Sequence, residues 1–443
     1  MTVFWCEQAW LGGANAADGV LLTVTGDAIT AVEIGVAAPP GGATRLDGLT
    51  LPGFANAHSH SFHRALRGRA HPNGGTFWSW RDRMYELAAV LDPDAFEALA
   101  TATFAEMVLA GYTVVGEFHY LHHGVDGTRY ADANELGRRL VAAARQAGIR
   151  LTLLDACYLC GGIGDPLNQV QRRFSDGSAQ GWVDRVSELH DTSTCRVGAA
   201  VHSVRAVDPA AIAIVAAWAA DRDVPLHAHV SEQPQENADC LAAHGVTPVG
   251  LLDSATALSE RFTAVHGTHV RAEDIETLAR RGARCCICPT TERDLADGIG
   301  PTLQLRDAGV ELCVGSDSQA VIDPFEETRA IELDERLASG RRGSHQPGDL
   351  LTAATASGYA SLGWAGGGAL ADGAIADFAT VSFDSPRLAG TDRADPLAAV
   401  VFAAAASDVR HVVVGGEVVV HDGTHQRVDV MSALERSVAA AWG

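Results

Sequence analysis

The 443-residue chain contains no lysine: all 33 of its basic residues are arginine. Without a lysine side chain, Schiff-base catalysis, a pyridoxal-phosphate linkage and a P-loop lysine are all excluded. A pair of metal ions bridged by a carboxylated lysine is excluded for the same reason. This absence restricts the possible mechanisms more than any other feature of the composition.

Basic residues are also few relative to acidic ones, and long apolar runs are missing. Asp and Glu together number 55, so the formal net charge is −22 and we expect neither nucleic acid nor a membrane as a partner. The longest apolar runs, Ala210–Ala220 and Leu397–Ala406, fall short of the ~20 residues that a membrane-spanning helix needs. Because 47% of the residues are hydrophobic and 20% charged, we expect a large packed core.

Export signals and a disulfide framework are not expected either. No basic residue precedes Arg45, which argues against a signal or transit peptide. Nine cysteines, an odd number, suit a reducing compartment, and we expect a cytoplasmic protein. Cys157/Cys160 and Cys285/Cys288 have Cys-x-x-Cys spacing, but residues three apart in a strand point to opposite faces. We therefore interpret both pairs as buried structural cysteines.

Eight strand-like runs, most of them separated by helical stretches, fill the middle of the chain. They cover residues 50–57, 113–118, 150–157, 196–201, 224–230, 262–266, 283–288 and 311–315. Asp92-Pro93 and Asp208-Pro209 are typical helix starts, because Asp caps the first turn and Pro fits into it. Eight βα units predict an α/β fold, a (β/α)8 barrel over residues 50–365. The active site of such a barrel lies at the carboxyl ends of its strands.

The two ends of the chain have a different pattern. Residues 1–49 contain short strand-like runs and turns, and residues 412–420 predict a hairpin around Gly415-Gly416. Each end alone is too small to bury a core. We therefore expect one small β-rich domain built from residues 1–49 plus 366–443, with a helix at Val428–Trp442 packed on the outside.

Histidine or aspartate side chains stand at the carboxyl ends of five of the predicted strands. The first run ends in His58-Ser59-His60, and because residues i and i+2 of a strand share a face, both imidazoles can face one metal ion. The other candidates are His202 after the fourth run, His229 and Glu232 after the fifth, His266 after the sixth and Asp317 after the eighth. Such groups at five strand ends indicate an active site rather than isolated structural residues.

This set of motifs resembles the amidohydrolase superfamily, which has HxH after the first strand, HxH after the fifth, His after the sixth and Asp after the eighth. A flanking β domain made from both termini is also typical of it. Within the superfamily, the segments NAHSHSFHRAL, FWSWRDRMY, GEFHYLHH, VHSVRAV, HAHVSEQ and GSDS resemble the formimidoylglutamate deiminases. The resemblance spans nearly the whole chain. It implies a homodimer that hydrolyses N-formimidoyl-L-glutamate to N-formyl-L-glutamate and ammonia in histidine degradation.

The residues suit such a reaction. Three imidazole nitrogens and one carboxylate suit a single Zn²⁺ with an open water position, although Fe²⁺ or Mn²⁺ could use the same ligands. The ligands would be His58, His60, His229 and Asp317. Zinc brings the pKa of its water to about 7, and Glu232 is placed to move the protons of the reaction. His266 would orient the nucleophile, and Asp317 would also accept a proton. For Glu232, a solvated carboxylate at a helix start is the alternative.

A substrate with two carboxylates needs positive charge around it. Arg81, in the long loop after the first strand, and Arg205, just past the fourth, can each grip a carboxylate with two N–H groups. A structural ion pair remains the alternative for Arg205. The resemblance assigns further substrate contacts to His63, Tyr120 and His202. His63 stands where the family usually has Gln, but an imidazole can still donate a hydrogen bond.

Two further interpretations stay open beside this one. A related zinc enzyme that deaminates a ring such as a purine would need an apolar, stacking pocket, whereas the two arginines favour an acyclic anion. A catalytically inactive barrel scaffold should have lost metal ligands, and this chain retains all four.

The histidines of the segment HYLHH (His119, His122 and His123) are interpreted as structural or supporting residues rather than as a second metal site.

Overall fold

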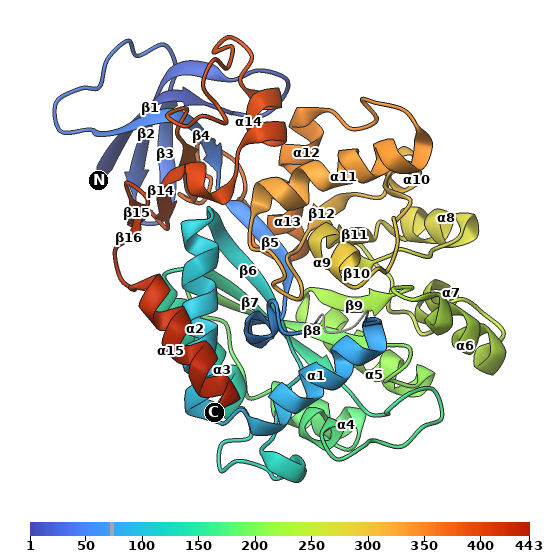
Figure 1. Ribbon diagram of the computed structural model, residues 1–443. Helices are drawn as coiled ribbons and strands as arrows, with labels where there is room; N and C mark the ends of the chain where they lie inside the picture. Colours follow the sequence, from blue (N-terminus) through green and yellow to red (C-terminus); the bar gives the residue numbers. More distant parts are fainter. Residues whose placement is uncertain (71–74) are drawn as a thin grey trace.

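The structure, a computed structural model, describes residues 1–70 and 75–443. Eight parallel strands form a nearly closed barrel, in which the spatial order of the strands follows their order along the chain (Figure 1). They are β5 (Phe54–Ser59), β6 (Tyr112–His119), β7 (Arg150–Cys157), β8 (Cys195–Ser203), β9 (Leu226–Val230), β10 (Phe262–His266), β11 (Arg284–Ile287) and β12 (Leu312–Val314). A parallel bridge between Ser59 and Asp317 links the two ends of the sheet. The predicted α/β barrel is confirmed.

Helices between and after the strands cover the outside of the barrel (Figure 1). They are α1 (Phe77–Val90), α2 (Pro93–Leu109), α3 (Glu135–Ala147), α4 (Ala179–Val186), α5 (Pro209–Arg222), α6 (Pro234–His244), α7 (Pro248–Ser254), α8 (Ala272–Arg281), α9 (Pro289–Asp294), α10 (Thr302–Asp307), α11 (Pro324–Ser339), α12 (Pro347–Ala354) and α13 (Ala356–Ser361). The side chains of Asp92 and Asp208 cap α2 and α5, each followed by Pro at the first helical position. Both predicted helix starts are confirmed.

A second sheet is built from both ends of the chain. In spatial order it contains β16 (Thr424–His425), β15 (Glu417–His421), β14 (Val409–Val414), β13 (Phe378–Val381), β4 (Thr44–Pro52), β1 (Thr2–Ala9), β2 (Ala17–Thr25) and β3 (Ala28–Glu33). Gly415 and Gly416 join β14 to β15 with φ angles of 58° and 78°. A two-residue type I′ hairpin turn requires positive φ angles at both positions. The predicted sheet from both termini is confirmed, whereas the domain boundaries 1–49 plus 366–443 and 50–365 stay a prediction.

The run predicted as one strand over residues 50–57 belongs to two strands. β4 ends at Pro52 in the terminal sheet, and β5 begins at Phe54 in the barrel. Between them, a Cβ added to Gly53 would lie 2.0 Å from the Thr113 hydroxyl of β6, so the chain passes from one sheet to the other where only glycine fits. This close approach depends on a residue far along the chain, and the local pattern does not reveal it.

The final helix, α15 (Val430–Trp442), lies beside α2 on the outside of the molecule (Figure 1). The indole nitrogen of Trp442 donates to the Ala65 carbonyl at 2.8 Å and attaches the helix to the segment after β5. Across the described ranges, no helix has both the length and the apolarity that a membrane crossing requires. All nine cysteines are free thiols.

Candidate active site

Three histidines and an aspartate meet at the carboxyl end of the barrel. The Nε2 atoms of His229 and His58 are 3.1 Å apart, and Asp317 Oδ1 lies 3.2 Å from His58 Nε2 and 3.3 Å from His60 Nε2. Neighbouring ligands of a tetrahedral ion with bonds of about 2.0 Å are themselves about 3.3 Å apart. The donor set and its spacing therefore fit one divalent metal ion.

Backbone carbonyls orient two of these three imidazoles. His60 Nδ1 donates to the Phe118 carbonyl at 2.9 Å, and His229 Nδ1 donates to the His202 carbonyl at 2.8 Å. With Nδ1 protonated, the lone pair of each ring lies on Nε2, which faces the other ligands. Burial lowers the pKa of His58 to about 3 and keeps this ring neutral, as metal binding requires.

Glu232 and His266 stand beside the ligand cluster. His266 Nε2 lies 3.8 Å from Glu232 Oε1 and 4.0 Å from Asp317 Oδ2. Its Nδ1 lies 3.4 Å from Glu292 Oε1, an oxygen that also accepts from the Cys288 backbone N–H. Burial alone would lower the pKa of His266, but Glu292, Glu232 and Asp317 raise it to about 10. The Cys288 N–H thus fixes Glu292, and Glu292 in turn contacts Nδ1 of the His266 ring.

The backbone is strained where two of these side chains leave the barrel. His266 has a φ of 71° and Asp317 a φ of 43°, in the left-handed region that disfavours residues other than glycine. Each such residue costs about 1–3 kcal/mol, which the packed strands around it must offset. Both side chains point at the ligand cluster as a result, and strain of this kind is common at active sites.

Arg205 forms an ion pair with Glu232. Its Nη2 lies 2.7 Å from Glu232 Oε2, and its Nε lies 3.7 Å from Glu236 Oε2. Glu236 in turn accepts from the backbone N–H groups of Ser231 and Glu232, at 3.1 and 3.3 Å. The Arg205 guanidinium thus has a carboxylate partner, as the ion-pair alternative supposed, and its role in substrate binding stays a prediction.

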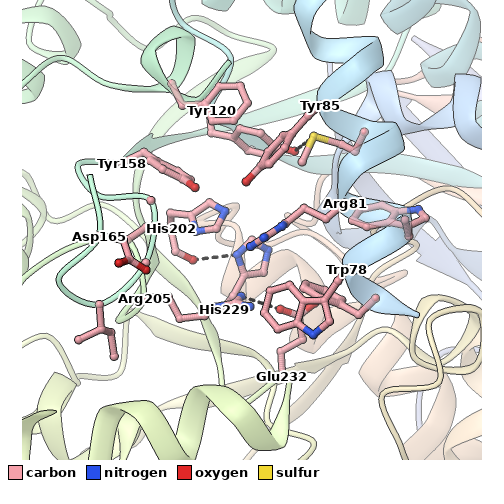
Figure 2. A pocket seen from close by; sticks show the side chains of 18 of the residues that line it. Trp78, Arg81, Tyr85, Tyr120, Tyr158, Asp165, His202, Arg205, His229 and Glu232 are labelled. Atoms are coloured by element: carbon pink, nitrogen blue, oxygen red, sulfur yellow. Dashed lines mark hydrogen bonds and ion pairs between the residues drawn. The ribbon is translucent and has the colours of Figure 1, made fainter. Parts of the chain in front are cut away.

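A cavity of about 620 Å³ opens above the ligand cluster (Figure 2). The residues proposed from the sequence that line it are His60, His63, Arg81, Tyr120, His202, Arg205, His229, Glu232, His266 and Asp317. His58 lies below them and is fully buried. Within the cavity wall, His63 Nε2 and the Tyr120 hydroxyl are 2.8 Å apart. The structure therefore brings every predicted site residue to one place.

Arg81 was expected in a loop, but it lies on the helix α1. Its guanidinium stacks 4.5 Å from the centre of the Trp78 ring and 5.6 Å from that of Tyr85, and Figure 2 shows it reaching into the cavity. In residues 1–70 and 75–443 no carboxylate forms an ion pair with it, and its buried Nε has no hydrogen-bond partner. Unlike Arg205, Arg81 offers a free cation to a ligand.

Sequence reasoning did not single out Tyr85 and Tyr158, which line the cavity, or Gln171, which contacts the hydroxyl groups of both. Tyr158 directly follows the end of β7, so its position at the carboxyl end of a barrel strand is a signal that could have identified it. Tyr85 lies one helical turn after Arg81 on α1 and shares its face. No local pattern marks Gln171, whose contacts come from distant segments.

The histidines of HYLHH belong to a buried polar network. Both carboxylate oxygens of Asp155 accept from Arg185, and Trp182 also donates to one of them. His119 and His122 lie near Asp155, while His123 Nε2 is 3.0 Å from Asp176. Because hydrogen bonds already occupy the oxygens of Asp155, we interpret this group as structural.

Comparisons with known proteins agree with this geometry. A family model described as the amidohydrolase family matches residues 49–419. The formimidoylglutamate deiminase of Pseudomonas aeruginosa is 38% identical over 439 residues, which cover 96% of each chain. The crystal structure of an amidohydrolase from Brucella melitensis has a TM-score of 0.89 and 33% identity over 100% of both chains. That of an adenosine deaminase from Xanthomonas campestris with bound zinc has a TM-score of 0.86 and 23% identity, covering 98% of this chain and 96% of that one. This chain belongs to the amidohydrolase family.

Proposed function

We propose that this protein hydrolyses N-formimidoyl-L-glutamate to N-formyl-L-glutamate and ammonia, with one zinc ion per chain. The observation that carries the proposal is a cavity in which a complete set of metal ligands and Glu232 lie near Arg81, a cation that has no carboxylate partner among the described residues. A free guanidinium beside a hydrolytic site favours an acidic, acyclic substrate. The 38% identity to a formimidoylglutamate deiminase supports the same substrate.

The metal site fits zinc by its donor atoms and their spacing. Three neutral imidazole nitrogens and one carboxylate oxygen would hold the ion: those of His58, His60, His229 and Asp317. Bound there, zinc supplies Lewis-acid activation of water at neutral pH. The bound zinc of the similar adenosine deaminase structure supports this choice of metal.

Glu232 is the proton carrier of the proposed reaction. Oε1 faces His266 and the ligand cluster, and Arg205 holds Oε2, so the carboxylate keeps one orientation. Water attacks the formimidoyl carbon, a C–O bond forms, and the C–N bond to the terminal nitrogen then breaks. Glu232 takes one proton from the water and passes it to that nitrogen as the C–O bond forms. Through Glu232, the proton of the resulting hydroxyl then follows to the same nitrogen, so that ammonia leaves as the C=O bond of the formyl group forms. His266 orients the attacking water from the other side.

Ammonia release from N-formimidoyl-L-glutamate by the purified protein tests the proposal, with the metal content measured on the same sample. We expect a kcat/KM of at least about 10⁴ M⁻¹s⁻¹, which is ordinary for an enzyme acting on its own substrate. Adenine- and guanine-type substrates serve as the comparison. Faster release from one of those rings would favour the ring deaminase instead, and a metal-loaded protein without any turnover would support the inactive scaffold.

We also propose that the enzyme is a cytoplasmic homodimer. Nine free thiols, eight of them buried, support a reducing compartment. A mass of twice the 46.4 kDa chain in light scattering would support the dimer, and a mass equal to one chain would contradict it.

A further inference from the structure

Two tyrosines in the wall of the cavity share one amide group. Gln171 Nε2 lies 2.9 Å from the Tyr85 hydroxyl and 2.9 Å from the Tyr158 hydroxyl. Tyr85 projects from α1, Tyr158 follows β7, and Gln171 begins the short 3₁₀ helix Gln171–Phe174. Figure 2 shows the hydroxyl groups of Tyr85 and Tyr158 directed toward the centre of the cavity. Neither tyrosine nor Gln171 has a part in the reaction described above.

The backbone fixes which way the Gln171 amide points. Its Oε1 accepts from the Asn168 backbone N–H at 2.9 Å, and the Gln171 N–H donates to Asn168 Oδ1 at 2.8 Å. Because the carbonyl end is used in this way, the NH₂ end faces the two phenols. Gln171 therefore donates to both hydroxyl oxygens, and each phenol keeps its own O–H hydrogen for another acceptor.

Apart from each other's oxygen, the two hydroxyl groups have no hydrogen-bond acceptor among the described residues. Burial raises the pKa of Tyr158, so this phenol carries its hydrogen at neutral pH. If one hydroxyl donates to the other, one O–H still remains for a ligand. The Arg81 guanidinium lies 5.6 Å from the centre of the Tyr85 ring, so a cation and phenolic donors meet on the same wall. Donors without an acceptor, next to a cation, suit an anionic oxygen ligand.

We propose that Tyr85 and Tyr158, together with Arg81, form a subsite for one carboxylate of a short acyclic dicarboxylate, and that Gln171 is the positioning residue that turns the phenolic hydrogens toward it. The proposal rests on the proposed function in that the carboxylate is one of the two carried by the substrate. It assigns specificity to residues that touch neither the metal ligands nor Glu232.

Binding of glutarate to the metal-loaded protein tests the subsite without turnover, since this five-carbon dicarboxylate has no formimidoyl group. A hydrogen bond to a charged group corresponds to roughly a 10-fold or larger change in Kd. Calorimetry should therefore show about 10-fold weaker binding for Tyr85→Phe and for Tyr158→Phe. The matched control is Tyr112→Phe, because the Tyr112 hydroxyl on β6 is buried outside the cavity and has no hydrogen-bond partner among the residues that the structure describes. Its Kd should equal that of the unmodified protein.

The variant Gln171→Glu tests the positioning role. A carboxylate at this position still accepts from the Asn168 N–H but cannot donate, so both phenols would turn their hydrogens toward residue 171 and away from the ligand. We expect the KM for N-formimidoyl-L-glutamate to rise at least 10-fold while kcat stays within about threefold and the melting temperature is kept. Equal losses of kcat and of melting temperature would indicate a merely structural residue and overturn the assignment.

A double-mutant cycle distinguishes the loss of phenolic donors from repulsion between the new carboxylate and the ligand. In a Tyr85→Phe/Tyr158→Phe background there is no hydroxyl hydrogen left to turn, so Gln171→Glu should add little to the Kd for glutarate. If Gln171→Glu raises this Kd by the same factor as in the unmodified background, the cause is repulsion, and the positioning role is contradicted.

The outcomes also distinguish the two proposals. Glutarate binding that weakens in both tyrosine variants, without turnover of N-formimidoyl-L-glutamate, would support the subsite and reject the proposed function. Turnover with unchanged glutarate binding in both variants, or no glutarate binding by the unmodified protein, would reject the subsite alone.

Discussion

Arg205 Nη2 and Glu232 Oε2 are 2.7 Å apart, so the cavity arginine that follows the fourth barrel strand is bonded to the candidate proton carrier that follows the fifth. Glu236 Oε2 lies 3.7 Å from Nε of the same guanidinium. Any substrate carboxylate that binds Arg205 must share it with Glu232. In the proposed reaction, Arg205 would therefore contribute both to substrate binding and to the position of the Glu232 carboxylate, whereas Arg81 would contribute to binding alone.

The two arginines should respond differently to the same substitution. Arg81→Met removes a cation without a carboxylate partner in the described structure, so kcat/KM for formimidoylglutamate should fall roughly 10–150-fold through KM, with stability kept. Arg205→Met leaves Glu232 and Glu236 without their partner, so kcat and the melting temperature should fall as well. Steady-state kinetics and thermal melting of both variants check this. Identical behaviour of the two variants would contradict the distinction.

Replacing Glu232 with Gln should abolish most of the turnover. Glu232→Gln keeps the shape and a hydrogen bond to Arg205 but cannot carry a proton, so kcat should fall by about 10²–10⁴-fold. Elemental analysis is the control, because Glu232 is not one of the four ligands and the metal should stay bound. Near-normal turnover would show that another group moves the proton.

The protein should bind one functionally required divalent ion per chain. One cluster of four buried ligand atoms surrounds a single position, and the sequence has no lysine that could bridge a second ion. His60→Asn should lose the ion and the activity together while the fold persists, as judged by circular dichroism. Two stoichiometric ions, both needed for turnover, would be incompatible with this prediction.

A buried ion pair should hold the terminal sheet on the barrel. Arg150 Nε, on β7, lies 2.8 Å from Oδ2 of Asp377, next to β13, and both side chains are at most 3% exposed. Arg150→Met leaves this carboxylate unpaired and should lower the free energy of unfolding by about 3–5 kcal/mol. Arg138→Met breaks the exposed ion pair with Asp132 and should lower the free energy of unfolding by at most about 1 kcal/mol. Denaturant titrations of both variants measure the difference. Similar losses in both variants would contradict the prediction.

Acid should destabilise the fold through His122. Burial, with help from the charge of Arg185, lowers the pKa of His122 from 6.5 to about 4. Between pH 6.5 and 4 the unfolded chain therefore binds a proton at this residue that the folded chain does not. The free energy of unfolding should therefore keep its full value above pH 6.5. As the pH falls from 6.5 to 4, it should decline by up to about 1.4 kcal/mol per pH unit.

The variant His122→Gln keeps a donor for the Ala156 carbonyl, which His122 Nε2 contacts at 2.8 Å, but it does not titrate. The dependence of unfolding free energy on pH should be flatter in this variant. An unchanged slope would show that other buried groups determine the acid response.

The positions of the metal ligands could be predicted because they depend on a local rule. His58, His60 and His229 lie within one residue of the carboxyl ends of buried strands. Because all strands of a parallel barrel end on one side, the chain order alone brings these residues together. Asp317 follows β12 by three residues and reaches the cluster for the same reason.

What could not be predicted depends on side chains that meet from separate elements. The pair of Arg205 and Glu232 joins residues 27 positions apart, and the contact of Gln171 with Tyr85 joins residues 86 positions apart. Neither pair has a periodic signal. The helix that carries Arg81 was missed because its residues, FWSWRDRMYELAAV, begin with aromatic side chains that have only moderate helix propensity.

The terminal sheet has a consequence for synthesis on the ribosome. Thr50 of β4 pairs with Thr380 of β13, and 330 residues separate them along the chain. At translation rates of 5–20 residues per second, about 17–66 s pass between the emergence of the two strands. During that time one edge of β4 has no partner strand, in a nascent chain whose barrel is still incomplete. Aggregation of truncated chains that end before β13 should therefore be far stronger than that of the full-length protein.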